Sequence, residues 1–253
     1  MIEITIPESN FVTLGGSSRG YAKKAPIGDL WYKVSAGAFN AQAEVVASRL
    51  AAYTNLGSFV TYEMCLVNGE YATVSKDYIR ARRYETLKGL HARVTGTPIE
   101  SVSQHLSGAE LLRYTRNLVL SEIGYDMLAE LSMLLQFDAL VQNEDRHFNN
   151  IMFMQENGKW EMAPAFDFDC TLYSCVEDLT KLKDYKSPAL PYCKTHKEQL
   201  ELMYSVSDVR LKLMAFDIEE ITSGVWEDRH QIGKNEVANY LNQLKGELEN
   251  GTV

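Results

Sequence analysis

The amino-acid sequence predicts an α+β fold in two parts, a small β-rich part over residues 1–80 and a larger helical part over residues 81–253. Short apolar segments separated by glycine turns favour strands in the first part. Longer segments with apolar residues at helical spacing favour helices in the second part. A chain of 253 residues, 45% of them hydrophobic, can bury a sizeable core as one two-lobed domain or as two small domains.

The first part is expected to hold four strands and one helix. The helix covers residues 41–54, because Val45 and Leu50 follow helical spacing and Asn40 is suited to the N-cap. A glycine-rich turn at Gly15–Gly20 separates the first two strands. The expected strands cover residues 11–14, 30–35, 60–67 and 71–74.

The second part is expected to be mainly helical from about Tyr84 onward, with one β-hairpin between two groups of helices. Two short apolar runs, Ile151–Met154 and Trp160–Ala163, flank Asn157-Gly158, which is a strong signal for a tight hairpin turn. The expected helices cover residues 108–120, 124–141, 196–204, 208–216, 218–225 and 234–248.

The net charge and the apolar segments limit the partners and the compartment that we expect for the protein. The formal net charge is −9, so nucleic acid and anionic membranes would repel the protein as a whole, and we expect neither as a direct partner. The first residues lack the basic start and long apolar stretch of a signal peptide. No segment approaches the run of about 18 apolar residues that marks a membrane span. We therefore expect a cytoplasmic protein.

The cysteines carry no recognisable chemical motif. The four cysteines stand at positions 65, 170, 175 and 193, with no CxxC pair and no metal-ligand spacing relative to the five histidines. In a cytoplasmic protein, this pattern predicts that all four thiols are reduced.

A polar motif ahead of the hairpin indicates phosphoryl transfer. It runs from Asp145 to Asn150, and Asp167 follows seventeen residues later. Phosphoryl transfer needs a carboxylate to orient the attacking hydroxyl and oxygen ligands to hold the magnesium that neutralises charge on the triphosphate. Asp145 is the expected catalytic base, and Asn150 and Asp167 are the expected magnesium ligands. Alone, Asp145 also suits a helix cap and Asn150 a turn, and it is their combination that favours catalysis.

The hairpin is expected to bring these side chains together. If its turn lies at residues 157 and 158, residue 150 lies opposite about residue 165, so Asp167 shares one end of the hairpin with Asn150. His147 is expected to brace the loop by hydrogen bonding as part of the catalytic site. Asp169 either places a second carboxylate near the metal or caps the next turn.

Lys33 and Glu44 form the expected upstream half of an ATP site. Strand alternation places Lys33 on the same strand face as Trp31, where it either binds the α- and β-phosphates or faces solvent. Glu44 lies on a helix face with small neighbours, so a cationic partner is expected there. Lys33 is the candidate partner, and the alternative is an exposed helical glutamate.

Two further segments are weaker candidates. The glycine-rich turn offers backbone N–H groups for ATP phosphates, and its candidate binding residues are Gly15, Gly16, Ser17 and Ser18. A basic stretch over residues 76–93 either attracts an anionic substrate segment or is a solvated face.

With these residues in hand, the chain resembles the HipA-like serine/threonine protein kinases of toxin–antitoxin modules. The resemblance rests on Asn143–Asn150 and on the proline-containing run Ala163–Asp167. It implies a bilobal protein-kinase-like fold, with Asp145 as base, Asn150 and Asp167 as magnesium ligands, and Lys33 as the ATP lysine. It also implies the cofactors ATP and Mg²⁺, a protein substrate, and an antitoxin or regulatory partner.

A second resemblance leaves the acceptor open. The same loop is similar to that of phosphatidylinositol 3- and 4-kinases, and its Asp-x-His-x-x-Asn core is similar to that of aminoglycoside and choline kinases. A small acidic chain without a membrane-binding element favours a protein acceptor. We expect a Ser/Thr protein kinase, with a lipid or small-molecule kinase and a nucleotide-binding pseudokinase as alternatives.

Overall fold

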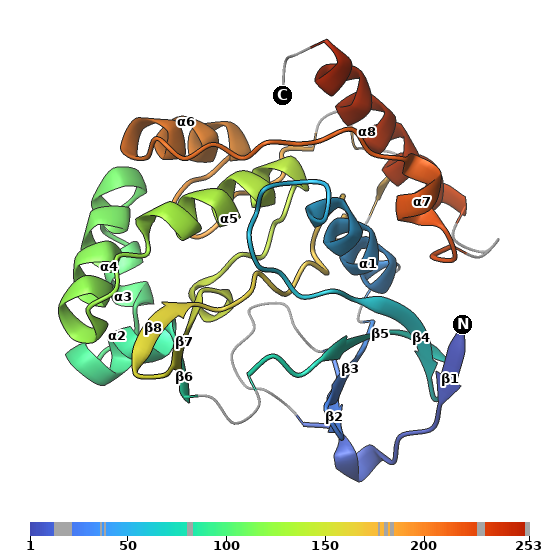
Figure 1. Ribbon diagram of the computed structural model, residues 1–253, viewed down its shortest axis with the longest axis horizontal. Helices are drawn as coiled ribbons and strands as arrows, with labels where there is room; N and C mark the ends of the chain where they lie inside the picture. The colour runs from blue at the N-terminus through green and yellow to red at the C-terminus, as the bar shows by residue number, and fades with distance from the viewer. Residues whose placement is uncertain are drawn as a thin grey trace.

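The computed structural model of the chain describes residues 1–12, 22–35, 37, 39–79, 83–176, 178–179, 182, 185–226 and 231–250. It has the expected α+β architecture, with a five-stranded sheet from the first part of the chain and most helices from the second (Figure 1). The glycine-rich turn that was expected at Gly15–Gly20 lies outside the described residues.

The five-stranded sheet has the order β1-β4-β5-β3-β2. Only the β1–β4 pair is parallel, and the others are antiparallel. A small apolar cluster that includes Val34, Cys65 and Ala72 packs on one face of this sheet. The strands are β1 (Ile2–Ile4), β2 (Lys24–Ile27), β3 (Leu30–Val34), β4 (Glu63–Val67) and β5 (Glu70–Lys76).

Helix α1 (Asn40–Ala51) lies between this sheet and α7 (Figure 1). The N-cap expected at Asn40 is wrong, because Phe39 occupies the cap position and Asn40 is already helical. The side chain of Asn40 instead donates a 2.9 Å hydrogen bond to the backbone oxygen of Asp169. An amide that was expected to serve its own helix thus connects α1 to a distant segment.

The remaining helices surround the second part of the chain, and a large core joins them to α1. Leu50, Phe137, Phe153, Phe168 and Leu241 are all fully or almost fully buried in that core. The helices are α2 (Leu87–Thr95), α3 (Glu100–Ser103), α4 (Gly108–Ile123), α5 (Leu128–Leu140), α6 (His196–Val206), α7 (Ile218–Thr222) and α8 (Gln231–Glu249), with short 3-10 turns at Glu8–Asn10 and Phe148–Asn150.

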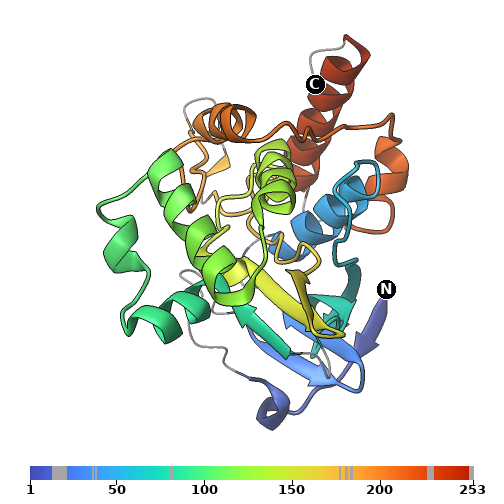
Figure 2. The same ribbon diagram turned by 60° about the vertical axis from the view of Figure 1, so that its left-hand side comes forward.

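The predicted hairpin is present as β7 (Met152–Glu156) and β8 (Lys159–Met162), between α4 and the five-stranded sheet (Figure 2). Glu156 pairs with Lys159, and extending that antiparallel register places residue 150 opposite residue 165, as predicted. Asn157 and Gly158 have φ angles of 51° and 79°, which is the left-handed pair that a type I′ turn requires. An unexpected strand, β6 (Arg83–Thr86), pairs with β7 and completes a second sheet.

The helix expected at residues 208–216 is wrong, because this segment is irregular and runs between α6 and α7. Two side-chain amides hold its backbone extended. Gln136 of α5 donates to Val209 O and accepts from Leu211 N, and Asn55 donates to Arg210 O and accepts from Lys212 N. These tertiary hydrogen bonds replace the intrahelical ones that the apolar spacing suggested.

The prediction of four reduced cysteines is also wrong. Cys170 and Cys175 form a disulfide with a Cα–Cα separation of 5.4 Å, while Cys65 and Cys193 are free. A turn over residues 172–175 folds the chain back and brings the two cysteines within bonding range. In the described part of the chain, no helix is long and apolar enough to cross a membrane.

Candidate active site

One buried guanidinium fastens the expected catalytic loop to the expected metal turn. Arg146 is completely buried, and its Nη1 atom donates to the backbone oxygens of Asn150, at 3.1 Å, and Phe166, at 2.7 Å. Asn150 is a predicted metal ligand, and Phe166 directly precedes the other, Asp167. The hairpin brings the two chain segments near each other, and Arg146 joins them at this point.

Asp138 of α5 balances the charge of Arg146. Its two carboxylate oxygens accept from Arg146 Nε at 2.8 Å and Nη2 at 3.0 Å, a paired geometry that suits a buried guanidinium. Asn143 donates to Asp138 as well, at 2.8 Å. The carboxylate therefore anchors both the start and the middle of the catalytic loop to a helix in the core.

Asp145 and Asn150 lie in this anchored loop and are both buried. The backbone N–H of Asp145 is held by Asn143 Oδ1 at 3.1 Å, and Asn150 Nδ2 donates to Asp145 O at 3.1 Å. The bracing hydrogen bond expected from His147 is not formed, because neither ring nitrogen has a hydrogen-bond partner among the described residues. Its Nε2 atom instead lies 3.9 Å from Asp145 Oδ2, so the imidazole faces the predicted base.

Lys33 of β3 lies at the centre of a second cluster, where three carboxylates meet it. Its Nζ atom is 3.0 Å from Glu44 Oε1 of α1, 2.9 Å from Asp169 Oδ2, and in direct contact with Asp167 Oδ1. Thr73 of β5 donates to the other Glu44 oxygen at 2.7 Å. The strand lysine, the helix glutamate and the metal turn thus come together, and Asp169 points into the site.

Electrostatics favour the charged forms of Lys33 and Asp167 through the pKa of each group. Burial alone would lower the pKa of Lys33, but Asp167, Asp169 and Glu44 raise it well above its ordinary value. Burial would likewise raise the pKa of Asp167, but Lys24 and Lys33 lower it below its ordinary value. Lys24 pairs directly with Lys33 across β2 and β3, and its Nζ lies 3.9 Å from Asp167 Oδ2. Two lysines therefore face the metal turn.

Asp167 adopts a backbone conformation that non-glycine residues rarely take, with a φ of 62°. Tyr62, in the segment that leads into β4, helps to hold it, because the Tyr62 hydroxyl accepts from Asp167 N at 3.2 Å. The Tyr62 ring also packs edge-on against Phe168. An uncommon conformation that its surroundings enforce is typical of functional sites.

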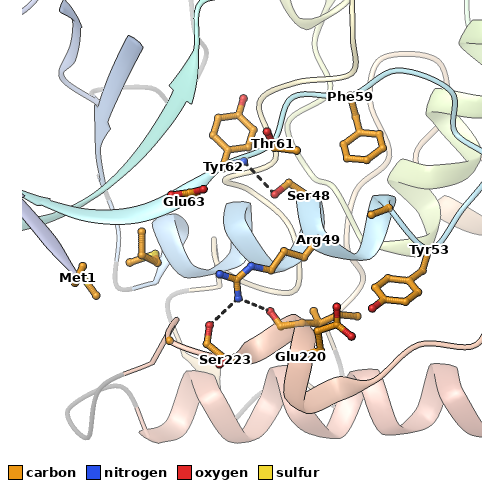
Figure 3. Close-up of a pocket in the computed structure, with 14 residues that line it drawn as sticks. Met1, Ser48, Arg49, Tyr53, Phe59, Thr61, Tyr62, Glu63, Glu220 and Ser223 are labelled. Carbon is orange, nitrogen blue, oxygen red and sulfur yellow. Dashed lines mark hydrogen bonds between the residues drawn. The ribbon is translucent and has the colours of Figure 1, made fainter.

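A separate cavity of about 540 Å³ lies beside α1, between α7 and the segment that leads into β4, and Tyr62 lines it too (Figure 3). Figure 3 shows Ser48 bonded to the backbone N–H of Tyr62, and Arg49 reaching towards the end of α7. Arg49 Nη1 donates to Ile221 O at 3.0 Å and to Ser223 O at 2.7 Å. The cavity lining does not include Lys33, Asp145 or Asp167, so this cavity is not the predicted site.

The side chains present fit magnesium and a triphosphate. Asn150, Asp167 and Asp169 supply the oxygen ligands that Mg²⁺ prefers, and Lys24 and Lys33 supply cations for phosphates. Among the described residues, no group of three or more His, Cys, Asp and Glu side chains is arranged to hold a metal alone.

Several residues of this site were not predicted from the sequence. Asp138 had a usable signal, because a carboxylate between the apolar residues Phe137 and Ala139 needs a buried cation, and Arg146 follows eight residues later. Lys24 and Tyr62 had none, since their roles depend on strand pairing and on long-range packing. Gly15, Gly16, Ser17 and Ser18 lie outside the described residues.

The fold is similar to that of a known kinase. The Helicobacter pylori proinflammatory kinase CtkA matches with a TM-score of 0.62 and 14% identity, over 97% of this chain and 94% of that chain. HipA of Shewanella oneidensis MR-1, from a toxin–antitoxin complex of HipA, HipB and operator DNA, matches with a TM-score of 0.46 and 14% identity, over 97% of this chain and 66% of that chain. The likeness to CtkA confirms the expected bilobal α+β fold.

Sequence comparison identifies the family. A search of curated protein sequences finds no match. The family model described as the HipA-like C-terminal domain, however, matches residues 31–232, which span β3 to the start of α8 and include Lys33, Asp145 and Asp167. The chain therefore belongs to the HipA-like C-terminal domain family.

Proposed function

We propose that the protein is an ATP- and Mg²⁺-dependent kinase that transfers the γ-phosphoryl group to a Ser or Thr hydroxyl of another protein. The observation that carries the proposal is the arrangement around Arg146. A single buried guanidinium joins the loop of Asp145 and Asn150 to the turn of Asp167, and Asp167 in turn contacts Lys33. Family and fold both support a kinase.

Each side chain has a role in this proposal. Asp145 accepts the proton of the acceptor hydroxyl or orients it, with His147 beside its carboxylate. Asn150 and Asp167 hold magnesium, which when bound neutralises charge on the phosphates. Lys33 binds the α- and β-phosphates while Glu44 keeps it in position, and Lys24 adds a second cation on the same side. Asp169 places a further carboxylate beside Asp167, with Oδ2 2.9 Å from Lys33 Nζ.

The acceptor class rests on the family resemblance and on charge. HipA-like kinases act on proteins, and a net charge of −9 is unfavourable for binding an anionic lipid surface. The resemblance also implies a regulatory partner protein. Co-purification of the tagged chain with proteins expressed from neighbouring coding sequences would identify such a partner.

The decisive experiment offers the protein labelled ATP with magnesium and, in parallel, a generic protein acceptor, phosphoinositides and an aminoglycoside. We expect label on Ser or Thr of the protein acceptor. Asp145→Asn should lower transfer by at least about a hundredfold with little change in nucleotide affinity, since the metal ligands remain. Asp208→Asn, at an exposed carboxylate outside the site, is the matched control.

The other outcomes would each favour a different function. Label on lipid or aminoglycoside would point to a small-molecule or lipid kinase, and nucleotide binding without any transfer would point to a pseudokinase. Turnover that survives Asp145→Asn unchanged would contradict the assignment of the base.

A further inference from the structure

The segment after the metal turn is closed into a small loop. The Cys170–Cys175 disulfide begins one residue after Asp169, and we refer to residues 170–175 as the disulfide loop. Cys170 is buried and Cys175 is half-buried, so Cys175 is the more accessible residue of the pair. The proposed mechanism does not use either sulfur, and their position suggests another role.

The first half of the disulfide loop binds the catalytic loop. Cys170 O accepts from the backbone N–H of Glu144 at 2.9 Å, and Glu144 directly precedes Asp145. Leu172 is fully buried, and its N–H donates to Val141 O at 2.8 Å. The backbone around Cys170 therefore helps to hold the residues that lead into the predicted base.

The second half of the loop binds the metal turn and α1. Ser174 Oγ donates to the backbone oxygen of Asp169, which also accepts from Asn40 Nδ2 at 2.9 Å. The same Asn40 nitrogen lies 3.6 Å from Cys175 Sγ. Since Asn40 is the first residue of α1 and Glu44 lies one turn further on, this end of the loop contacts the helix that presents Glu44 to Lys33.

The disulfide loop has a backbone conformation that its surroundings must enforce. Leu172 and Tyr173 have φ angles of 52° and 66°, and the left-handed region is unfavourable for two consecutive non-glycine residues. Such residues persist only where the neighbouring structure constrains them. The covalent link between residues 170 and 175 is one of those constraints, so the loop is expected to relax when the link is broken.

We propose that the Cys170–Cys175 disulfide is a redox-controlled clamp on the active site, which holds Asp169, the catalytic loop and α1 together when oxidised and loosens them when reduced. The inference rests on the proposed kinase function and names a regulation of the same site. The reductant is a dithiol. One of its thiolates attacks the half-buried Cys175 sulfur and forms a mixed disulfide, releasing the Cys170 thiolate, which takes up a proton. Its second thiolate then attacks the mixed disulfide and releases Cys175, and the dithiol leaves as a disulfide.

Reduction should lower phosphoryl transfer, because the loop no longer holds Asp169 and Asn40 in position. The wild-type protein would be equilibrated with oxidised glutathione or with dithiothreitol, and transfer from Mg-ATP would be measured in both states. Alkylation of free thiols followed by mass spectrometry would count the free cysteines. We expect two free thiols and high transfer when oxidised, and four free thiols with transfer lower by about tenfold to a hundredfold when reduced.

Cysteine variants separate the clamp from a general effect of the reductant. Cys175→Ser should have the low rate in both buffers, while Cys193→Ser, which removes a half-buried free thiol, should respond to reduction like the wild type. A thermal melt of each variant establishes that it is folded. In the folded protein, low transfer by Cys175→Ser supports the clamp.

Two results would overturn the inference while leaving the kinase proposal intact. One is four free thiols in the protein treated with oxidised glutathione. The other is a transfer rate that differs by less than about twofold between the two redox states. Absence of transfer in both states would instead refute the proposed function, and the regulation of that function with it.

Discussion

At Arg146, a guanidinium with no solvent exposure meets four oxygen atoms, two from Asp138 and one each from the backbones of Asn150 and Phe166. A buried charge is tolerated only when it is paired and its hydrogen bonds are satisfied, and both conditions hold here. The Asp138–Arg146 pair therefore contributes to the geometry of the site by holding the backbones of Asn150 and Phe166 in place.

Asp138→Asn should strongly destabilise the protein. The substitution leaves Arg146 buried without its counter-charge, and breaking a buried pair in this way typically costs about 3–5 kcal/mol. Chemical denaturation would measure the free energy of unfolding. Transfer activity of the remaining folded protein should fall as well, because Arg146 would no longer be oriented towards Asn150 and Phe166.

The control for this change is an exposed pair with similar geometry. Arg116 makes hydrogen bonds of 2.8 and 2.6 Å to the two oxygens of Asp126, but the two side chains are 40% and 44% exposed. Asp126→Asn should therefore lower the free energy of unfolding by less than about 1 kcal/mol. Equal losses for the two variants would show that burial is not what makes the Asp138–Arg146 pair important.

In the segment between α6 and α7, hydrogen bonds from one side chain take the place of those that a helix would form. Gln136 lies on α5, is almost completely buried, and supplies a donor to Val209 O and an acceptor to Leu211 N. The segment is extended where the Gln136 amide forms these two hydrogen bonds with its backbone. Helical spacing of apolar residues in this segment is therefore overruled by a polar residue some seventy positions earlier.

Gln136→Met should loosen this segment while keeping the volume of the side chain. It leaves Val209 O and Leu211 N, which belong to half-buried residues, without their partner amide, at a cost of about 1 kcal/mol. Hydrogen exchange at the amide of Leu211 should become faster than in the wild type. Gln243→Met, at an exposed position on α8, should leave both stability and exchange within error, and unchanged exchange in Gln136→Met would contradict the assigned role.

At the scale of the whole molecule, the candidate site is built from both parts of the chain. Lys24, Lys33 and Glu44 come from the β-rich part, whereas Asn150 and Asp167 come from the part that contains the hairpin. A bound nucleotide with magnesium would contact both parts at once. A ligand that binds only the folded state raises the free energy of unfolding. When the ligand contacts both parts of the chain, both parts are stabilised.

Mg-ATP should therefore raise the melting temperature, by an amount equivalent to about 2.7 kcal/mol when ATP is present at a hundred times its dissociation constant. Removal of magnesium with EDTA should abolish most of this rise, and Asp167→Ala should show little rise even with magnesium. A full rise in Asp167→Ala would contradict the metal role of that residue. Melting of Asp208→Asn with and without Mg-ATP is the control for loss of a carboxylate.

The sequence alone determined the parts of the fold that depend on local pattern. Helical periodicity predicted α4, α5, α6 and α8 to within a few residues, and Asn157-Gly158 predicted the hairpin and its register because that turn geometry depends on those two residues. The candidate residues Asp145, Asn150 and Asp167 were identified by the chemistry that their oxygens share. The same local signals could not find β6, whose pairing with β7 joins segments far apart in the chain.

Only the tertiary structure decided how these residues are held. The contacts of Asp138 with Arg146, and of Lys24 and Tyr62 with Asp167, depend on packing between separate elements, and the Cys170–Cys175 disulfide depends on the turn between its two cysteines. The turn between the two cysteines holds Leu172 and Tyr173 in the left-handed region, which non-glycine residues disfavour. The surrounding structure must therefore enforce this conformation. The sequence thus determined which groups the protein offers for the proposed phosphoryl transfer, because side-chain chemistry is local. The fold decided the distances between them, because Lys33 and Asp167 are far apart in the chain and meet only in the folded protein.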